Sequence, residues 1–490
     1  MQVQKHVTRR DFLRLGTLGA AGAVLITACG SPASPAPAAT SVPATSAPAA
    51  KPTEAAKPAE PTKPAAAAAP VATPTPVPTA AAKPATSQGG TMQLLTWFAA
   101  DSPARQVNLK IIQEYTDKHP GLKTEIQDVP MAEYQRKLQT MYAANQGPDL
   151  LWISIWRIGP FVKAGRFLQL DELYQGDKDS PKYLKGVLDD GKSQGKLYGM
   201  PTEASTWVTL YNKTMFEKAG LKTPEQMDQE GNWNPQSVVE AAKKLTVSEG
   251  GRVTSYGFLS EPQVYTWATY ARVAGGKLID DARTKFTLNQ KENVEALQWL
   301  GDVINEYKVA PGLTDTQQEG YLPRLTNQRL AMTNNWNVYV ADVKRAIADK
   351  FEFDIYYPPY TKQKAGWTHS NLISITQTTK FRDQAWELAR ILPNSDSVKR
   401  RLAVGYGETP LLDDPSVQEA YTKLIPVEHT GIVADLMKPE ARITLPYNDN
   451  WEEQRYKVIE PGMQQVLLGK AKAADIMAKM EADANELMPK

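Results

Sequence analysis

The stretch DLLWIS, residues 149–154, is a short apolar run with the length and composition of a strand buried on both faces. The residues before it repeat at helical spacing, with Tyr134, Leu138 and Met141 on one side. A Gly-Pro pair at 147–148 ends that helix, because proline disfavours helical backbone in the residue before it. The sequence therefore predicts a helix that leads into a buried strand.

Two further strands lie upstream of this unit. Residues 92–98 (MQLLTWF) are predicted as the first, and residues 122–129 (LKTEIQDV) alternate as the second. Between them, Ser-Pro at 102–103 offers an N-cap and a first-turn proline, and His-Pro-Gly at 119–121 stops the helix. This order predicts an α/β fold with a parallel sheet and right-handed crossovers, in which ligands bind beyond the carboxyl ends of the strands.

The rest of the chain also contains predicted strands and helices, but they alternate less regularly. Residues 206–212 (TWVTLYN) are predicted as a strand, and residues 289–292 have capping-box spacing before a helix. Apolar stripes at 381–392 and 476–487 are predicted as the core faces of two more helices. About 400 residues follow Gly89, which is too many for one core, so we expect two lobes.

The N-terminus has the layout of an export signal. The arginines at 9–10 with Phe-Leu at 12–13 resemble a twin-arginine signal, and the apolar run 15–28 has 14 residues, fewer than the ~20 that span a bilayer. The run ends in ITAC at 26–29, which resembles a bacterial lipobox. We therefore expect 1–28 to be a signal peptide and Cys29, the only cysteine, to be lipidated, which leaves no cysteine for redox or metal chemistry.

A tether is predicted after this cysteine. The segment to about residue 90 is almost entirely Ala, Pro, Thr and Ser, so it cannot bury enough apolar surface to offset the entropy of ordering. The formal net charge of +2 becomes −1 once the +3 of residues 1–28 is subtracted, and no basic excess suggests a nucleic acid partner. The 11 Trp and 20 Tyr against 10 Phe favour partly polar ligands.

Several segments, in order, resemble one family of proteins. They are GPDLLWISIWRIGPFVKAGRFLQLDEL (147–173), GKLYGMPTEASTWVTLYNKTMFEKAGL (195–221), EPQVYTWATYARVAGGKLID (261–280), RLAMTNNWNVYV (329–340) and GETPLLDDP (407–415). Together they resemble the extracellular solute-binding proteins of ABC importers, and among these the sugar-binding family that includes maltose-binding protein. The likeness covers nearly all of residues 90–490.

The resemblance implies a two-lobed periplasmic-binding-protein fold, class II-like, with lobes joined by a multi-strand hinge. Residues 91–202 and 363–411 would form the first lobe, and 203–362 and 412–490 the second. The implied function is capture of a sugar, chiefly an oligosaccharide, between the lobes and delivery to the membrane permease. The implied protein is a monomer without cofactor, metal site or catalysis, lipid-anchored at the outer face of the cytoplasmic membrane.

A sugar presents apolar C–H faces and a rim of hydroxyls, so aromatic faces beside polar side chains are the expected partners. The resemblance places these candidates near the ligand: Trp97, Asp101, Trp156, Arg157, Glu203, Trp207, Glu261, Tyr265, Trp267, Asn335, Trp336 and Trp367. At Trp156 this chain departs from the Asp-Arg pair of maltose binders and keeps only the arginine, Arg157. Trp207, Trp267 and Trp367 would equally suit the core of the crossing strands, and Arg157 an interdomain salt bridge.

Two alternatives remain open at this point. A secreted glycoside hydrolase would need two carboxylates about 5–5.5 Å apart, and Glu203 with Glu261 could supply them, although no nucleophile-elbow or metalloprotease motif is present. The ligand could also be a peptide, a polyamine or a phosphodiester. A polyamine site would need several acidic side chains, and a phosphate site would need clustered arginines or glycine-rich amides.

Overall fold

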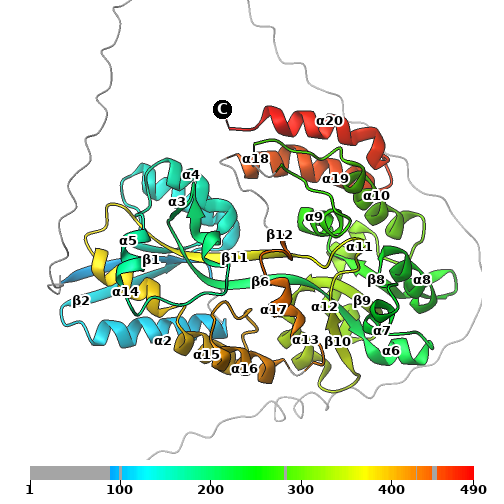
Figure 1. Cartoon of the computed structure of the whole chain (residues 1–490), viewed down its shortest axis with the longest axis horizontal. Coiled ribbons are helices and arrows are strands. Elements are labelled where there is room, and N and C mark those ends of the chain that lie inside the picture. The colour runs from blue at the N-terminus through cyan, green and yellow to red at the C-terminus, as the bar shows by residue number, and fades with distance from the viewer. Residues whose placement is uncertain (1–88, 99–101, 281–283, 426, 444–449, 490) are drawn as a thin grey trace, which may run out of the picture. The chain divides into compact units, whose positions relative to one another are not determined.

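The computed structural model describes residues 89–98, 102–280, 284–425, 427–443 and 450–489 (Figure 1). The predicted signal peptide, the lipidation site Cys29, the tether up to residue 88 and the candidate Asp101 lie outside the described residues. Within the described ranges, no helix combines the length and the apolar character that crossing a bilayer requires.

The first part of the chain forms the parallel sheet that the sequence predicts. Strand β1 (Gly90–Thr96) pairs in parallel with β2 (Leu122–Asp128) on one side and β3 (Leu150–Ser154) on the other. Helices α2 (Pro103–Asp117) and α3 (Met131–Ala143) make the crossovers. The Ser102 side chain caps α2 by accepting from the Arg105 N–H, as predicted.

Two long strands connect this sheet to the rest of the chain. Strand β6 (Met200–Asn212), buried throughout, and β11 (Gly366–Ile375) run antiparallel to each other (Figure 1). The first half of β6 pairs with β11, which also pairs with β3, whereas its second half pairs with β9 (Leu330–Trp336) and β10 (Phe353–Tyr356). With β8 (Arg252–Ser260) and β7 (Val247–Glu249) at the far edge, the strand order is β2-β1-β3-β11-β6-β9-β8-β7.

Strand β6 begins six residues before the predicted strand at 206. The pairing shifts register between Asn371 and Leu372, beside Pro201. Because proline cannot donate to a ladder, it is tolerated in a strand where the pairing is irregular. Because of this proline, a search for uninterrupted strand patterns misses the first residues of β6.

The remaining elements are as follows. The short strands are β4 (Lys192–Ser193), β5 (Lys196–Leu197), β7 (Val247–Glu249), β8 (Arg252–Ser260) and β12 (Arg442–Ile443). The helices in the first half are α4 (Ile158–Lys163), α5 (Asp171–Gly176), α6 (Lys213–Lys218), α7 (Pro224–Gln229) and α8 (Pro235–Leu245). Those in the middle are α9 (Val264–Val273), α10 (Lys291–Asn305), α11 (Leu313–Gln318), α12 (Tyr321–Thr326), α13 (Val340–Ile347), α14 (Arg382–Ile391) and α15 (Ser395–Ala403). The last are α16 (Pro415–Leu424), α17 (Ile432–Leu436), α18 (Trp451–Gln454), α19 (Glu460–Leu467) and α20 (Ala473–Glu486). Single turns of 3-10 helix are η1 (Ile155–Arg157), η2 (Leu188–Gly191) and η3 (Asn337–Tyr339), and η4 (Arg455–Ile459) is a π-helical turn.

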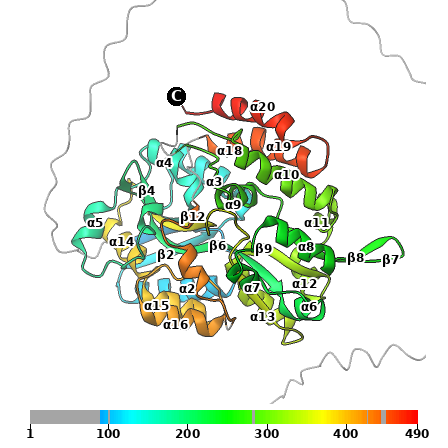
Figure 2. The same cartoon turned by 45° about the vertical axis from the view of Figure 1, so that its right-hand side comes forward.

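The predicted capping box at 289–292 is wrong. Helix α10 begins at Lys291, and its N-cap residue Gln290 makes no side-chain cap bond. The backbone N–H of Asn289 instead donates to Glu481 Oε2 on α20 (2.8 Å). A tertiary contact has replaced the local one, and α19 and α20 pack beside α10 (Figure 2).

Candidate ligand-binding cleft

Two adjoining cavities lie where the strands β6, β9 and β11 meet the segments around them. The first, about 360 Å³, is lined by residues that include Glu203, Asp342 and Tyr406; we call it the Glu203 cavity. The second, about 390 Å³, is lined by residues that include Trp156, Tyr265, Arg455 and Glu460; we call it the Arg455 cavity. Both are lined by Trp336 and His369, so the two cavities adjoin at these residues, and we call them together the cleft.

Aromatic rings from four separate segments meet in this cleft. Trp156, in η1 directly after β3, stacks with its ring centroid 6.1 Å from that of Tyr265 on α9. Trp336, at the end of β9, lies 6.0 Å from Tyr265, and the His369 ring lies 4.6 Å from Trp156 and 5.4 Å from Trp336. Three residues that the sequence analysis proposed, Trp156, Tyr265 and Trp336, are therefore brought together.

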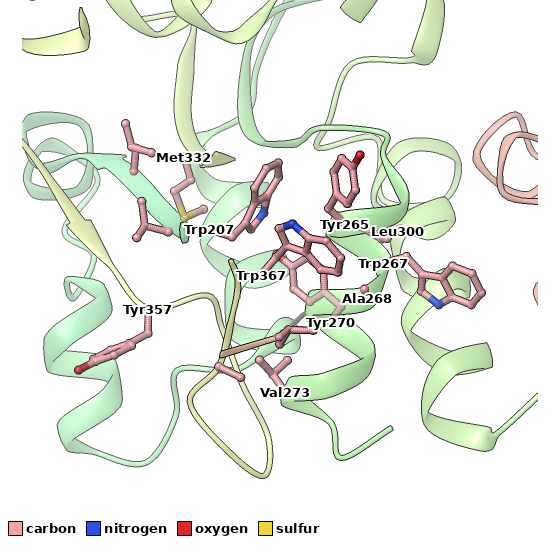
Figure 3. Packing of buried hydrophobic residues seen from close by; sticks show 14 of the residues in the cluster. Trp207, Tyr265, Trp267, Ala268, Tyr270, Val273, Leu300, Met332, Tyr357 and Trp367 are labelled. Carbon is pink, nitrogen blue, oxygen red and sulfur yellow. The ribbon is translucent and has the colours of Figure 1, made fainter. Parts of the chain in front are cut away.

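Two of the proposed tryptophans lie beneath this cluster. Trp207 packs edge-on against Trp336 at 4.7 Å. Trp367 packs at 4.9 Å from Tyr265, and Figure 3 shows Trp207, Trp367 and Tyr265 close to one another. Both are fully buried and line neither cavity. They support the rings that line the cleft, which is the core role that the sequence left open for them.

Trp267 also lies in the core. It is fully buried, and its indole N–H donates to the Asn293 carbonyl (2.7 Å) on the far side of α9 from Tyr265 (Figure 3). Each residue of an α-helix is rotated by about 100° from the one before it. Side chains two residues apart therefore differ in direction by about 200°, so Tyr265 and Trp267 cannot face the same cavity. We leave Trp267 out of the proposed site.

A buried charge cluster adjoins the Glu203 cavity. The Tyr406 hydroxyl donates to Glu203 Oε2 (2.6 Å), and burial raises the pKa of this carboxyl. Arg401 on α15 donates from Nε to Glu408 Oε1 (2.8 Å), and both side chains are 2% exposed. Burial, with a smaller contribution from Glu203, raises the pKa of Glu408 to about 7 despite Arg401. The Arg401 guanidinium thus bonds to Glu408, and its charge also partly offsets the effect of burial on the pKa of Glu203.

Arg455 forms one wall of the second cavity and was missed by the sequence analysis. It lies in the π-helical turn η4, a type of turn frequent at functional sites. Its Nη1 donates to the Tyr265 hydroxyl (2.7 Å), and its Nε donates to Glu460 Oε1 (2.6 Å). The guanidinium also lies 5.0 Å from the Tyr265 ring centroid and 4.9 Å from that of Tyr456. No sequence signal marks this turn, because a π-helical turn has no characteristic residue pattern.

Two other proposed residues do not line either cavity. Trp97, half-buried, packs edge-on against Tyr134 at 4.9 Å. Arg157, also half-buried, points its Nη1 toward the sulfur of Met131 (3.2 Å). Neither is in the cavity lining, so both stay sequence predictions without support from the cleft geometry.

The last two proposed residues lie close behind the lining. Asn335 is buried, and its side-chain oxygen accepts from the Trp336 backbone N–H (2.8 Å), which orients the turn into the cleft. Glu261 lies in a small apolar pocket that shares Pro262 and Met463 with the Arg455 cavity, and burial raises the pKa of its carboxyl. Glu203 and Glu261 do not line one common cavity, which weighs against a glycosidase pair.

One group in the described ranges has ligand atoms close enough to hold a metal ion, and it lies away from the cleft lining. It consists of Glu225, Glu428 and His429. Lys213 already pairs with Glu428 Oε2 (2.8 Å), and His429 Nδ1 lies 2.6 Å from Asp354 Oδ2. Protein contacts therefore account for this cluster.

Comparison with known proteins agrees with the fold. The pattern of the bacterial extracellular solute-binding protein family matches residues 100–392. A putative binding protein of Brucella abortus (strain 2308) is 23% identical over 384 residues, which is 78% of this chain and 89% of that protein. An arabinooligosaccharide-binding protein of Bacillus subtilis (strain 168) is 26% identical over 237 residues, 47% of this chain and 52% of that protein.

Solved structures show the same architecture. An ABC substrate-binding protein from Listeria monocytogenes in complex with cycloalternan superposes with a TM-score of 0.71 at 22% identity, over 81% of this chain and 99% of that one. The GacH receptor of Streptomyces glaucescens, solved unliganded and with acarbose, gives 0.68 at 18% identity, over 82% and 99%. Maltose-bound MalE3 of T. maritima gives 0.64 at 20% identity, over 81% and 100%. These similarities confirm the predicted two-lobed α/β fold, while the lobe boundaries stay a prediction. With well over half of its length matched, this chain belongs to the bacterial extracellular solute-binding proteins, the substrate-binding components of ABC transporters.

Proposed function

We propose that the chain captures an oligosaccharide in the cleft and delivers it to the permease of an ABC importer. The observation that carries this proposal is the meeting of Trp156, Tyr265 and Trp336 in a cleft that also holds Glu203 and Arg455. Flat aromatic faces suit the C–H faces of a sugar, and carboxylate and guanidinium groups suit its hydroxyls.

The charges of the cleft favour a neutral ligand. Arg455 is paired with Glu460 in the Arg455 cavity, and Arg345 is paired with Asp342 in the Glu203 cavity. A phosphate ligand would need unpaired basic groups, and a polyamine would need several unpaired acids. The paired groups instead offer donors and acceptors side by side, which suits hydroxyls. Two cavities joined at Trp336 and His369 favour a ligand of more than one sugar unit.

The cellular setting follows from the family and from the N-terminal sequence. The family is extracellular. We propose that Cys29 carries a lipid that anchors the protein to the outer face of the cytoplasmic membrane, and that the folded part is a monomer. Mass spectrometry of the mature N-terminus would test the anchor: a diacylated peptide beginning at Cys29 is expected, and a free Cys29 thiol would contradict it.

Binding of a saccharide is expected to raise the thermal stability of the purified protein. A ligand at 100 times its dissociation constant stabilises the folded state by about 2.7 kcal/mol. The panel is maltotriose, lactose, an arabinooligosaccharide, the sugar alcohol mannitol, a peptide and a polyamine, scanned by differential scanning calorimetry, with chromatography of the same samples for cleavage products. A shift with intact saccharide supports a binder, and accumulating products would support a hydrolase. Stabilisation by a peptide or polyamine, and by none of the saccharides, would contradict the proposed ligand class.

Trp156→Ala and Trp336→Ala are each expected to weaken saccharide binding at least about tenfold, because each removes an aromatic face from the cleft. The matched control is Trp299→Ala, on α10, whose ring packs against Phe258 and Tyr270 outside the cleft lining. Isothermal titration measures all three, and circular dichroism checks that each folds. Unchanged affinity in both cleft variants would show that the ligand lies elsewhere.

A further inference from the structure

We infer that His369 is a specificity-determining residue, which offers the unprotonated ring nitrogen Nδ1 to a hydroxyl of the ligand where the two cavities join. The inference rests on the proposed function, since it takes the ligand to be rich in hydroxyl groups. It assigns a hydrogen-bonding role to the imidazole of His369, which the description of the cleft gives only as one ring of the aromatic cluster.

The position of His369 is central to the cleft. It lies on the connecting strand β11 and lines both the Glu203 cavity and the Arg455 cavity. Its ring is held between Trp156 at 4.6 Å and Trp336 at 5.4 Å. A saccharide that contacts both cavities would therefore lie next to this imidazole.

A chain of hydrogen bonds fixes which ring nitrogen carries the proton. Asn371 is the cross-strand partner of Glu203, and its side-chain amide donates to that carboxylate. The amide oxygen of Asn371 must then face the other way, where it accepts from Ser154 Oγ (3.1 Å) and lies 3.2 Å from His369 Nε2. A carbonyl oxygen can only accept, so Nε2 must carry the hydrogen and Nδ1 must carry the lone pair.

The surroundings of the ring keep it uncharged. Burial, opposed only by the contact with Asn371, lowers the pKa of His369 to about 4. Within the described ranges, none of the carboxylates near the cleft forms an ion pair with this imidazole. The charged or titratable groups that line the two cavities with it are Glu203, Tyr265, Tyr339, Asp342, Arg345, Tyr406, Arg455 and Glu460.

Nδ1 has no hydrogen-bond partner among the described residues although it is buried. A buried acceptor without a donor destabilises a structure, and the majority of such atoms are satisfied. A ligand hydroxyl placed beside the imidazole would supply the missing donor. The site would then discriminate against an analogue that lacks this hydroxyl, because the acceptor would stay unsatisfied.

The tautomer can be tested without any ligand, by nitrogen-15 NMR of the imidazole rings in the folded protein. We expect His369 to show a protonated Nε2 and an unprotonated Nδ1 at neutral pH, and to stay neutral as the pH falls to about 5. Asn371→Asp replaces the amide by a carboxylate and is expected to raise the pKa of the ring, which identifies Asn371 as a positioning residue. A ring that is protonated at Nδ1, or charged at about pH 6, would overturn the inference.

The contact with the ligand can be tested with two variants that each keep one ring nitrogen's function. His369→Gln places an amide near Nε2 and loses the acceptor at Nδ1, whereas His369→Asn keeps an acceptor near Nδ1. Isothermal titration uses the saccharide of the panel that stabilises the wild type best, and its monodeoxy analogues. We expect His369→Gln to bind at least about tenfold more weakly and His369→Asn to retain affinity within about threefold.

One monodeoxy analogue should lose as much affinity for the wild type as His369→Gln does, and lose nothing further in that variant. Equal binding of the parent saccharide by wild type and His369→Gln, or additive losses for every analogue, would overturn the inference while leaving the proposed function in place. If no saccharide binds the wild type, the proposed function fails, and the ligand contact at His369 fails with it.

Discussion

Replacement of Arg401 by methionine is expected to lower the free energy of unfolding by about 3–5 kcal/mol, because it leaves the buried acceptors on Glu408, Asn108 and Leu392 without their donor. Arg401 is 2% exposed and holds Glu408, the Asn108 side chain (3.2 Å) and the Leu392 carbonyl (2.9 Å) together. Methionine fills part of the buried space that the Arg401 side chain occupies but cannot donate a hydrogen bond. Equilibrium denaturation with urea at neutral pH gives the measurement.

The neighbouring Arg400 provides a matched control. It also pairs with a carboxylate, donating two hydrogen bonds of 2.9 Å to Glu114, but these side chains are 27% and 45% exposed. Solvent screening makes the contribution of such an exposed pair small. If Arg400→Met and Arg401→Met destabilise equally, burial of the Arg401–Glu408 pair is not what stabilises this region.

The second large effect is a dependence of stability on pH that Glu408→Gln should remove. The pKa of Glu408 is raised from 4.5 to about 7, mainly by burial. The folded protein therefore keeps this proton at pH values where the unfolded chain has already released it. Stability contributed by the protonated form is present below about pH 4.5 and is lost as the pH rises through about 7. The loss amounts to roughly 3 kcal/mol, at 1.36 kcal/mol per pKa unit.

Unfolding free energies of the wild type and Glu408→Gln, measured from about pH 5 to about pH 8, test this expectation. Glutamine resembles the protonated acid. The free energies of unfolding of the two proteins should therefore be similar at the acidic end, and that of the variant should be higher at the alkaline end. His369 acts in the opposite sense, because its lowered pKa removes stability as the pH falls from 6.5 toward about 4. A constant difference between wild type and Glu408→Gln across the range would show that Glu408 does not titrate in this window.

The regular elements of the first sheet could be predicted because their signals are local. Alternation in 122–129, the apolar run 149–154 and the Ser-Pro pair at 102–103 each specify their own backbone, and the structure confirms them. The capping box predicted at 289–292 is also a local signal, but it is wrong because a tertiary contact replaced it. Its residues were free to bond elsewhere, and Asn289 bonds to α20.

The aromatic residues of the cleft were only partly predictable. Trp156, Tyr265 and Trp336 were proposed from their places near the ends of strands and in a matching segment, and they meet. Composition does not distinguish them from Trp207, Trp267 and Trp367, which are fully buried. The face on which each indole lies depends on strand pairing and helix phase, and these are set by contacts between distant segments.

The sequence by itself determined the α/β class, the order of the first strands, the family and the kind of surface that a sugar-binding cleft needs. Only the tertiary structure decided that Arg401 pairs with the buried Glu408, that a π-helical turn brings Arg455 to Tyr265, and that Asn371 fixes the tautomer of His369. The physical reason is distance along the chain. Strand and helix patterns repeat within ten residues or so, whereas hydrogen bonds and pKa values depend on partners that only folding brings within reach.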